Sequence, residues 1–182
     1  MFFPVGRIRK ILEELKDNVY RQSQPVNGYR VKECGYGDFD LLQEDPASWR
    51  LFGDDESWGG RDTHCWFKTT VQLPESYAGR TVVYRVGSDR EGWDATNPQL
   101  LVFVNGKVEQ GLDVNHQEVF LTDCAKAGET FDIALYAYGG MQPQSSKLRS
   151  QISVLQEDVE KLYYHINVPL EVADLLDEQD KR

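Results

Sequence analysis

Apolar and polar residues alternate in the middle of this chain in the pattern of a β-strand. Between residues 65 and 73, one face carries Phe67 and Val71 and the opposite face carries Lys68 and Gln72. A period of two is typical of a strand that places one face against a core. The pattern therefore predicts a strand over this stretch, which Pro74 ends.

A second stretch, Leu100 to Val104, is continuously apolar, which indicates a strand that is buried on both faces. Asn105 and Gly106 follow directly, and an Asn-Gly pair readily adopts the positive φ angles of a type I′ turn. We therefore predict a β-hairpin whose return strand begins near Val108.

Other short apolar segments predict further strands, separated by turns that contain Gly and Pro. These segments are residues 30–33, 81–86, 118–121, 131–138 and 150–156. Residues 21–64 show weak periodicity, so we expect an extended segment that wraps around the domain and buries Trp49, Phe52 and Trp58. Short strands at such intervals are typical of an antiparallel β-sandwich.

Both ends of the chain have helical periodicity instead. Apolar residues recur at helical spacing from Ile8 to Val19 and again from Val159 to Ile166. Pro169 lacks a backbone donor, so we expect it to kink the second helix or to begin another one. The predicted fold is mainly β: a jelly-roll, galactose-binding-like antiparallel sandwich in residues 21–156, with amphipathic helices in residues 1–20 and 157–182.

Composition narrows the class of protein. The chain has 182 residues, 40% hydrophobic and 27% charged, which is enough for one globular domain with a full core. Its net charge of −10 disfavours binding to the phosphate backbone of nucleic acid. No apolar run approaches the roughly 20 residues of a membrane helix, and residues 1–5 are too short for a secretory signal. We therefore expect a cytoplasmic protein that binds neither nucleic acid nor membrane.

Cys34, Cys65 and Cys124 are an odd number at wide spacing, so we expect reduced thiols. The motifs of the common catalytic sites are missing. The sequence has no His-x-His, no His-Glu-x-x-His, no Gly-x-Ser-x-Gly and no phosphate-binding glycine loop. The histidines are His64, His116 and His165, too far apart in sequence to suggest a zinc site. We assign no catalytic residue and expect no metal or cofactor in this chain.

The loops on either side of the predicted hairpin combine Trp, Asp, Asn and His. An indole ring can stack on a pyranose, and Asp and Asn side chains can bond to neighbouring hydroxyl groups. The candidate residues for a carbohydrate or interdomain contact are Trp93, Asp94, Asn97, Asp113, Asn115 and His116. Three interpretations remain open: a sugar site, a surface that faces a neighbouring domain, or a structural role in which the Asp and Asn side chains cap turns.

Three separated segments also carry a resemblance to a known family. They are Gly59-Gly-Arg-Asp-Thr-His-Cys-Trp-Phe67, Arg90-Glu-Gly-Trp-Asp-Ala-Thr-Asn-Pro-Gln99 and Gln110-Gly-Leu-Asp-Val-Asn-His116. In this order they resemble the domain that precedes the catalytic barrel in α-mannosidases of glycoside hydrolase family 38, in the bacterial and vacuolar or cytosolic branch. The likeness extends over nearly the whole chain.

The resemblance implies a non-catalytic N-terminal domain. The family's zinc-binding His-x-His-x-Asp signature, aspartate nucleophile and acid lie in the following barrel domain, and none has a counterpart here. Zinc is therefore expected only in that missing catalytic domain, which would hydrolyse terminal α-mannosides with retention. The implied partners are the barrel of the same polypeptide and further copies in a homo-oligomer. The alternative function is an autonomous carbohydrate-binding module; an enzyme in its own right has little support from the motifs.

Overall fold

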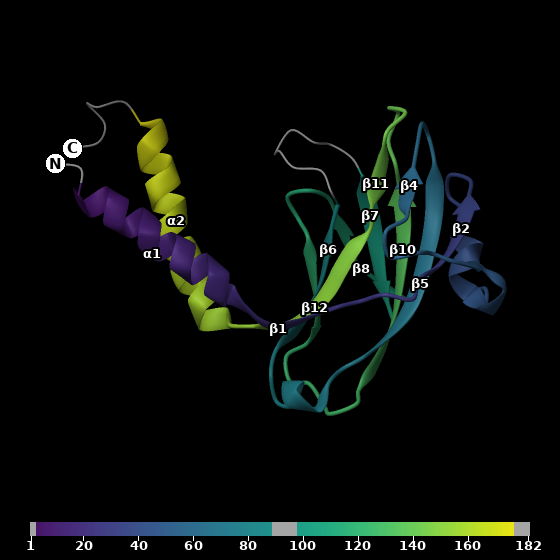
Figure 1. The fold of residues 1–182 in the computed structure, drawn as a ribbon, viewed down its shortest axis with the longest axis horizontal. Coiled ribbons are helices and arrows are strands. Elements are labelled where there is room, and N and C mark those ends of the chain that lie inside the picture. Colours follow the sequence, from purple (N-terminus) through teal and green to yellow (C-terminus); the bar gives the residue numbers. More distant parts are fainter. Residues whose placement is uncertain (1–2, 89–97, 177–182) are drawn as a thin grey trace. The chain divides into compact units, whose positions relative to one another are not determined.

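The computed structural model describes residues 3–88 and 98–176, and in these ranges the fold is mainly antiparallel β with a helix at each end (Figure 1). The helices are α1 (Phe3–Val19) and α2 (Glu157–Leu175). The strands are β1 (Tyr20–Pro25), β2 (Arg30–Cys34), β3 (Arg50–Leu51), β4 (Ser57–Gly59), β5 (His64–Gln72), β6 (Val82–Gly87), β7 (Gln99–Val104), β8 (Lys107–Leu112), β9 (Glu118–Thr122), β10 (Thr130–Tyr138), β11 (Ser145–Lys147) and β12 (Arg149–Leu155). Short 3-10 helices are η1 (Phe39–Gln43), η2 (Pro46–Ser48) and η3 (Glu75–Tyr77).

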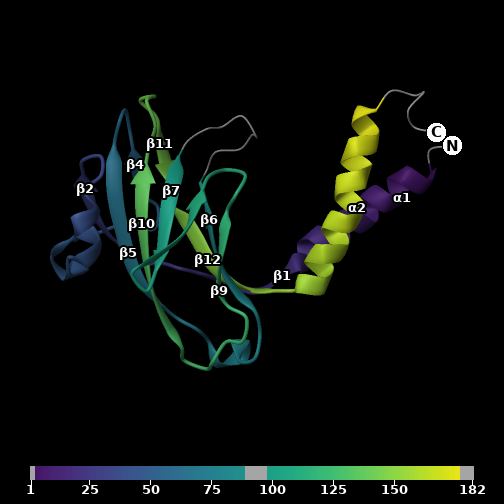
Figure 2. The ribbon, with the colours of Figure 1, turned by 180° about the vertical axis from the view of Figure 1, so that it is seen from behind.

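The strands form two principal sheets, which face each other in both views (Figures 1 and 2). In the described ranges, one sheet has the order β1-β12-β6-β9 and the other has the order β3-β2-β5-β10-β7-β8, while β11 and β4 form a separate pair. The predicted antiparallel sandwich with terminal helices is therefore confirmed. Contacts divide the chain into two compact units, one made of Met1–Ser23 with Val154–Arg182 and the other of Gln24–Ser153.

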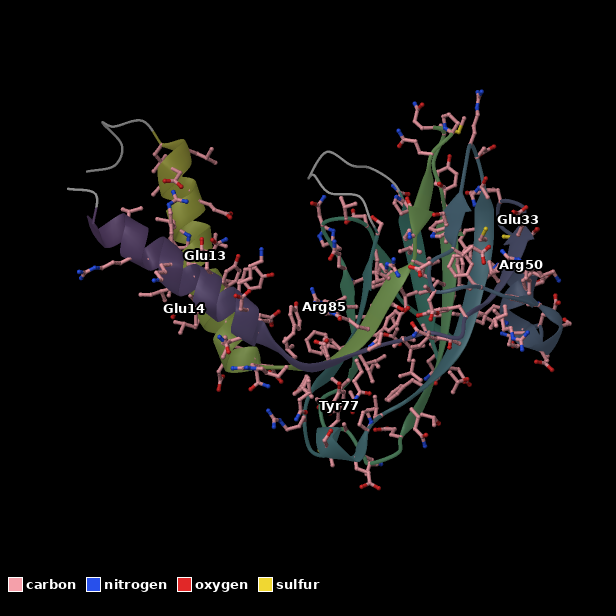
Figure 3. All side chains as sticks on the ribbon, viewed as in Figure 1. Glu13, Glu14, Glu33, Arg50, Tyr77 and Arg85 are labelled. Atoms are coloured by element: carbon pink, nitrogen blue, oxygen red, sulfur yellow. The ribbon has the colours of Figure 1, made fainter. Side chains whose placement is uncertain are left out.

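The main core lies on the inner face of the six-stranded sheet. Leu135 of β10 lies opposite Phe67 of β5 on one side and Val102 of β7 on the other, and all three side chains are fully buried. Tyr77, labelled in Figure 3, extends from η3 and is also fully buried. Burial of large apolar side chains is the main favourable term in folding, so this layer fixes the sandwich.

The predicted hairpin is present as β7 and β8. Asn105 has a φ of 51° and Gly106 a φ of 77°, as a type I′ turn requires. The backbone N–H of Asn105 donates to the carbonyl of Asp132 at 2.8 Å, and the Asn105 side-chain oxygen accepts from the backbone N–H of Asp132 at 2.9 Å. These bonds join the turn to β10 and hold the register of the central strands.

A second, smaller core lies on the outer face of the same sheet. Trp66, Phe103 and Tyr136 project from three neighbouring strands, and Trp49 packs against them from the segment that carries η1 and η2. The expected burial of Trp49, Phe52 and Trp58 is confirmed.

The strand predicted at residues 30–33 is confirmed as β2, but β1, β3 and β4, which also begin within or next to residues 21–64, were not predicted. These strands have two to six residues, and β1 is exposed over most of its length, so their apolar residues show no period.

Helix α2 continues through Pro169, so of the two alternatives predicted there, a kink or a second helix, the second helix was wrong. Pro169 and His165, the residue four positions earlier, are both exposed, and water can satisfy the carbonyl that the missing donor leaves unpaired. Helices α1 and α2 cross and pack against each other (Figure 1), and Leu12 and Val19 of α1 are buried. Within the described residues, neither helix has the length and apolar character to cross a membrane.

Candidate functional site

A cleft of about 1060 Å³ opens on the outer face of the six-stranded sheet, beside the small core. It lies where β5 and β7 begin and where β2, β8 and β10 end. The cleft is lined by Cys34, Gly35, Tyr36, Phe39, Asp62, His64, Gln99, Leu100, Leu101, Gly111, Leu112, Asp113, Tyr136 and Tyr138. We call it the aromatic cleft.

Three stacked rings form the floor of the aromatic cleft. Tyr138 lies directly opposite His64 in the pairing of β10 with β5, and their ring centroids are 4.7 Å apart at an interplanar angle of 23°. Tyr136 stacks on His64 in turn, at 5.5 Å and 20°. Tyr36 meets the edge of His64 at 5.8 Å from the loop after β2. The floor is therefore a rigid aromatic surface built on two strands.

Hydrogen bonds fix the orientation of these rings. The Tyr136 hydroxyl lies 2.9 Å from His64 Nδ1, and it accepts from the backbone N–H of Gly37 at 3.0 Å. It also lies 3.4 Å from the carbonyl of Gly35. Burial raises the pKa of Tyr136, so this hydroxyl keeps its proton at neutral pH. The loop after β2 is thus tied to the floor of the cleft.

A close approach of two glycine pairs shapes one wall. A Cβ on Gly139 would lie 3.1 Å from the Cα of Gly59, so a larger residue there would have to push the facing backbone aside by a few tenths of an ångström. The backbone N–H of Asp62 donates to the carbonyl of Gly140 at 2.7 Å, and Asp62 has a φ of 55°. A non-glycine residue in this conformation costs about 1–3 kcal/mol and is found mostly where the surrounding structure imposes it. Here that structure places Asp62 at the wall of the cleft.

Asp113, Asn115 and His116 form one turn between β8 and β9. Asp113 Oδ1 accepts the backbone N–H groups of Asn115 and His116, both at 2.8 Å, and lies 3.1 Å from His116 Nδ1. These bonds lower the pKa of Asp113, so it is poorly suited to act as a proton donor. Of the three, Asp113 lines the aromatic cleft. The structure therefore brings these candidates together as an Asp-capped turn beside the cleft.

The remaining sequence candidates, Trp93, Asp94 and Asn97, lie outside the described residues. Tyr36, His64, Tyr136 and Tyr138 were missed as cleft residues. Two Gly-Gly pairs in the sequence could have pointed to these residues. Gly59-Gly60 shortly precedes His64 at the start of one predicted strand, and Gly139-Gly140 directly follows Tyr138 at the end of another.

The cleft offers binding groups rather than reactive ones. Burial raises the pKa of the Cys34 thiol to about 11, so the thiolate that would act as a nucleophile is scarce at neutral pH. His64 lies in β5, His116 in the turn and His165 in α2. Among residues 3–88 and 98–176, no three His, Cys, Asp or Glu side chains gather in a way that could hold a metal ion. Within these ranges, the available donors therefore do not fit a zinc site.

The fold and the cleft define a β-sandwich domain with one open aromatic surface. The family model described as the α-mannosidase jelly-roll domain matches residues 27–166, more than half of the chain. The chain therefore belongs to the α-mannosidase jelly-roll domain family, and the resemblance and the jelly-roll fold predicted from the sequence are confirmed. No curated protein sequence matched.

Solved structures show the same fold. The β-glucuronidase from Ruminococcus gnavus in complex with D-glucuronic acid matches with a TM-score of 0.55 and 12% identity, over 75% of this chain and 30% of that chain. A β-glucuronidase from an uncultured Clostridium sp. matches with a TM-score of 0.53 and 13% identity, over 75% and 30%. This chain thus spans less than a third of the length of these glycosidases. At such identities the likeness establishes the fold alone.

Proposed function

We propose that this chain is a non-catalytic N-terminal domain of an α-mannosidase and that it docks on the catalytic domain of the same polypeptide through α2. Family membership supplies the class of enzyme. The observation that carries the docking is an exposed apolar stripe on α2, which has no buried residue in its 19 residues.

Two different faces of α2 are apolar. The half-buried apolar residues recur at helical spacing along one side, as expected for the side that packs on α1; they are Val159, Tyr163, Ile166, Leu170 and Ala173. On the other side, Tyr164, Val168, Val172 and Leu175 follow one another at spacings of four, four and three residues. We call these four residues the outer stripe. A helix with a single partner needs one apolar face, so the outer stripe indicates a second partner.

The outer stripe is well exposed. Tyr164, Val168 and Val172 retain 53%, 50% and 50% of their accessible surface, and Leu175 retains 86%. Removing apolar surface from water is worth about 25 cal/mol per Å², and contiguous exposed patches of this kind mark interaction sites. A helix pair of this size is marginal without further packing. Covering the outer stripe would therefore stabilise the pair as well as join it to its partner.

The proposed occupant is the α-mannosidase catalytic domain. The matched glycosidases are more than three times as long as the segment that shares this fold, so the fold occurs as one part of larger enzymes. In the whole enzyme this domain would position and stabilise the catalytic domain, which would hydrolyse terminal α-D-mannosides and hold the zinc. The sandwich itself would supply no acid, base or nucleophile. A homo-oligomer of the whole enzyme would form through surfaces other than the outer stripe.

We also assign the protein to the cytoplasm. Its three cysteines are free, and Cys124 is exposed, as suits a reducing compartment.

The docking is tested by titrating this chain with the catalytic domain encoded in the same reading frame and measuring the heat of binding. The double variant Val168→Lys/Val172→Lys is expected to weaken binding by at least about tenfold, because it places two charges in a desolvated apolar contact. Val108→Lys is the matched control, since Val108 is 59% exposed on β8 and lies outside the outer stripe. Circular dichroism would check that the helices of each variant are intact.

Three results would contradict the proposal: no binding, equal weakening by the control, or sedimentation of the chain as a dimer that dissociates in the double variant. The last result would assign the outer stripe to a second copy of the chain.

A further inference from the structure

We propose that the aromatic cleft is a binding site for a neutral hexopyranoside, with Tyr36 and Tyr138 packing on the sugar ring and Asp62 accepting from its hydroxyl groups. The inference stands independently of the docking of α2, because none of the residues that line the cleft belongs to either helix. It also differs from the loop site expected from the sequence, with which it shares Asp113.

Exposed aromatic side chains are the first support. Tyr36 retains 89% of its accessible surface although it makes an edge-type contact with His64, and Phe39 retains 46%. Tyr138 is half-buried, with one face against His64. A large ring left open to water beside a rigid stack offers an apolar face to a ligand at low cost in side-chain entropy. The C–H face of a pyranose is a ligand surface of this shape.

The charges of the lining select the class of ligand. Over the described part of the chain, residues 3–88 and 98–176, the lining contains Asp62 and Asp113 but no Lys or Arg. Phosphorylated or acidic ligands would be repelled, both by these carboxylates and by the net charge of −10. Carboxylate oxygens and the amide of Gln99 can accept hydrogen bonds from hydroxyl groups, and the Gln99 amide can also donate. An uncharged ligand rich in hydroxyl groups with one apolar face satisfies both parts of the cleft.

The cleft has the size and rigidity of a small-molecule site. Its volume of about 1060 Å³ lies just above the roughly 300–1,000 Å³ range of ligand pockets, which leaves room for one or two sugar rings. The stacked floor is fixed by the pairing of β5 with β10. The contact of Gly139 with Gly59 and the bond from Asp62 to Gly140 fix the wall. A site that is formed before the ligand arrives loses less free energy to ordering on binding.

The proposal is tested by titrating the isotope-labelled chain with methyl α-D-mannopyranoside and following backbone amide shifts. The expected result is saturable shifts that cluster at the residues lining the cleft. Tyr36→Ala is expected to weaken binding by at least about fivefold, since stacking on the ring is lost. Tyr164→Ala is the matched control, because Tyr164 is an exposed tyrosine on α2 and should leave binding unchanged.

A second variant tests the polar wall. Asp62→Asn keeps the size of the side chain, and asparagine tolerates the same positive φ, so the fold should persist. Binding is expected to fall about tenfold, because the charged acceptor is removed. Asp123→Asn, at an exposed position outside the lining, should leave binding unchanged.

Two outcomes would overturn the proposal. One is the absence of shifts at the cleft with methyl α-D-mannopyranoside, methyl α-D-glucopyranoside and methyl α-D-galactopyranoside up to about 100 mM, well beyond a millimolar Kd. The other is binding of tetramethylammonium in place of any sugar, since aromatic rings beside carboxylates can also hold a cation. Either outcome leaves the docking of α2 unaffected, because that is measured separately by titration with the catalytic domain.

Discussion

The phenolic oxygens of Tyr29 and Tyr84 lie 2.5 Å apart, and both side chains are buried. Tyr84 belongs to β6 of the four-stranded sheet, while Tyr29 immediately precedes β2 of the six-stranded sheet. The Tyr29 hydroxyl also lies 2.6 Å from Ser150 Oγ on β12. This small network links the two sheets by polar bonds within an apolar core, where each bond is stronger than it would be in water.

The network predicts a loss of stability at alkaline pH. Burial raises the pKa of Tyr29 to about 12 and the pKa of Tyr84 well above its usual value. Above pH of about 10 the unfolded chain therefore releases protons that the folded chain still holds, so the free energy of unfolding falls as pH rises. The stabilisation is fully present below about pH 10, and the contribution of Tyr29 is lost between about pH 10 and 12.

Urea unfolding at pH values of about 9 and 11.5 checks this prediction. Tyr29→Phe removes one titrating group, so its free energy of unfolding should fall less between the two values than that of the unmodified chain. Tyr164→Phe, at an exposed position, should show the full fall. An equal fall in all three proteins would refute the assignment to the buried tyrosines.

Removing the buried amine of Lys68 is expected to cost more stability than removing that of an exposed lysine. Its side chain retains 8% of its accessible surface, Nζ donates to the carbonyls of Leu42 and Glu44 at 2.8 and 2.6 Å, and it lies 4.7 Å from the centroid of the Trp49 ring. Lys68→Met keeps the stem but leaves both carbonyls without this donor, which should lower the free energy of unfolding by about 1–3 kcal/mol.

Lys32→Met is the control for this change. Lys32 pairs with Glu44 at 2.7 Å, with both side chains more than a third exposed, so its loss should cost less than about 1 kcal/mol. Denaturant unfolding of the two variants measures the difference. An equal cost would mean that Lys68 does not hold the segment that carries η1 and η2.

Two glycines of the β7–β8 hairpin are expected to respond differently to replacement by alanine, as measured by the free energy of unfolding. Gly106 has a positive φ and open space around the position of a Cβ, so Gly106→Ala tests backbone conformation alone. We expect it to lower the free energy of unfolding by about 1–2 kcal/mol. Gly111 lies in the strand of the same hairpin, and its Cβ would make only an ordinary contact, so Gly111→Ala should be neutral or slightly stabilising. Thermal melting of the two variants measures which substitution lowers the stability of the chain more.

The cysteines predict an order of alkylation. Burial raises the pKa of Cys65 to about 12 and that of Cys34 to about 11, whereas Cys124 is exposed. Iodoacetamide reacts with the thiolate, so at a pH of about 8 Cys124 should be labelled first, Cys34 more slowly and Cys65 last. Peptide mass spectrometry over time gives the order. Rapid labelling of Cys34 would show that the aromatic cleft opens more than its structure indicates.

Sequence patterns predicted the longer strands because side chains alternate between the two faces of a strand, which is visible over a few neighbouring residues. Residues 65–73 and 131–138 alternate apolar with other side chains in the sequence, and their strands pair along their whole length as β5 and β10, although five consecutive residues of each strand are buried. The Asn105-Gly106 turn was predictable because positive φ angles restrict the choice of residue. The short strands β3, β4 and β11 were not predictable, since two or three residues cannot display a period.

The aromatic cleft was not predictable for a different reason. Tyr138 and His64 meet through the register of β5 with β10, although the sequence separates them by more than 70 residues. A single sequence carries no direct signal of that register. The turn at Asp113 was visible as a polar cluster, but its capping role became evident only from the bonds to the backbone of Asn115 and His116.

The central claim is that this domain supports an α-mannosidase without performing its chemistry. The most direct test is hydrolysis of 4-nitrophenyl α-D-mannopyranoside by the purified 182-residue chain, with and without added zinc. We predict no release of nitrophenol above that of buffer in either condition. Turnover by the chain that disappears in Asp62→Asn or Asp113→Asn would contradict the claim and make the aromatic cleft an active site.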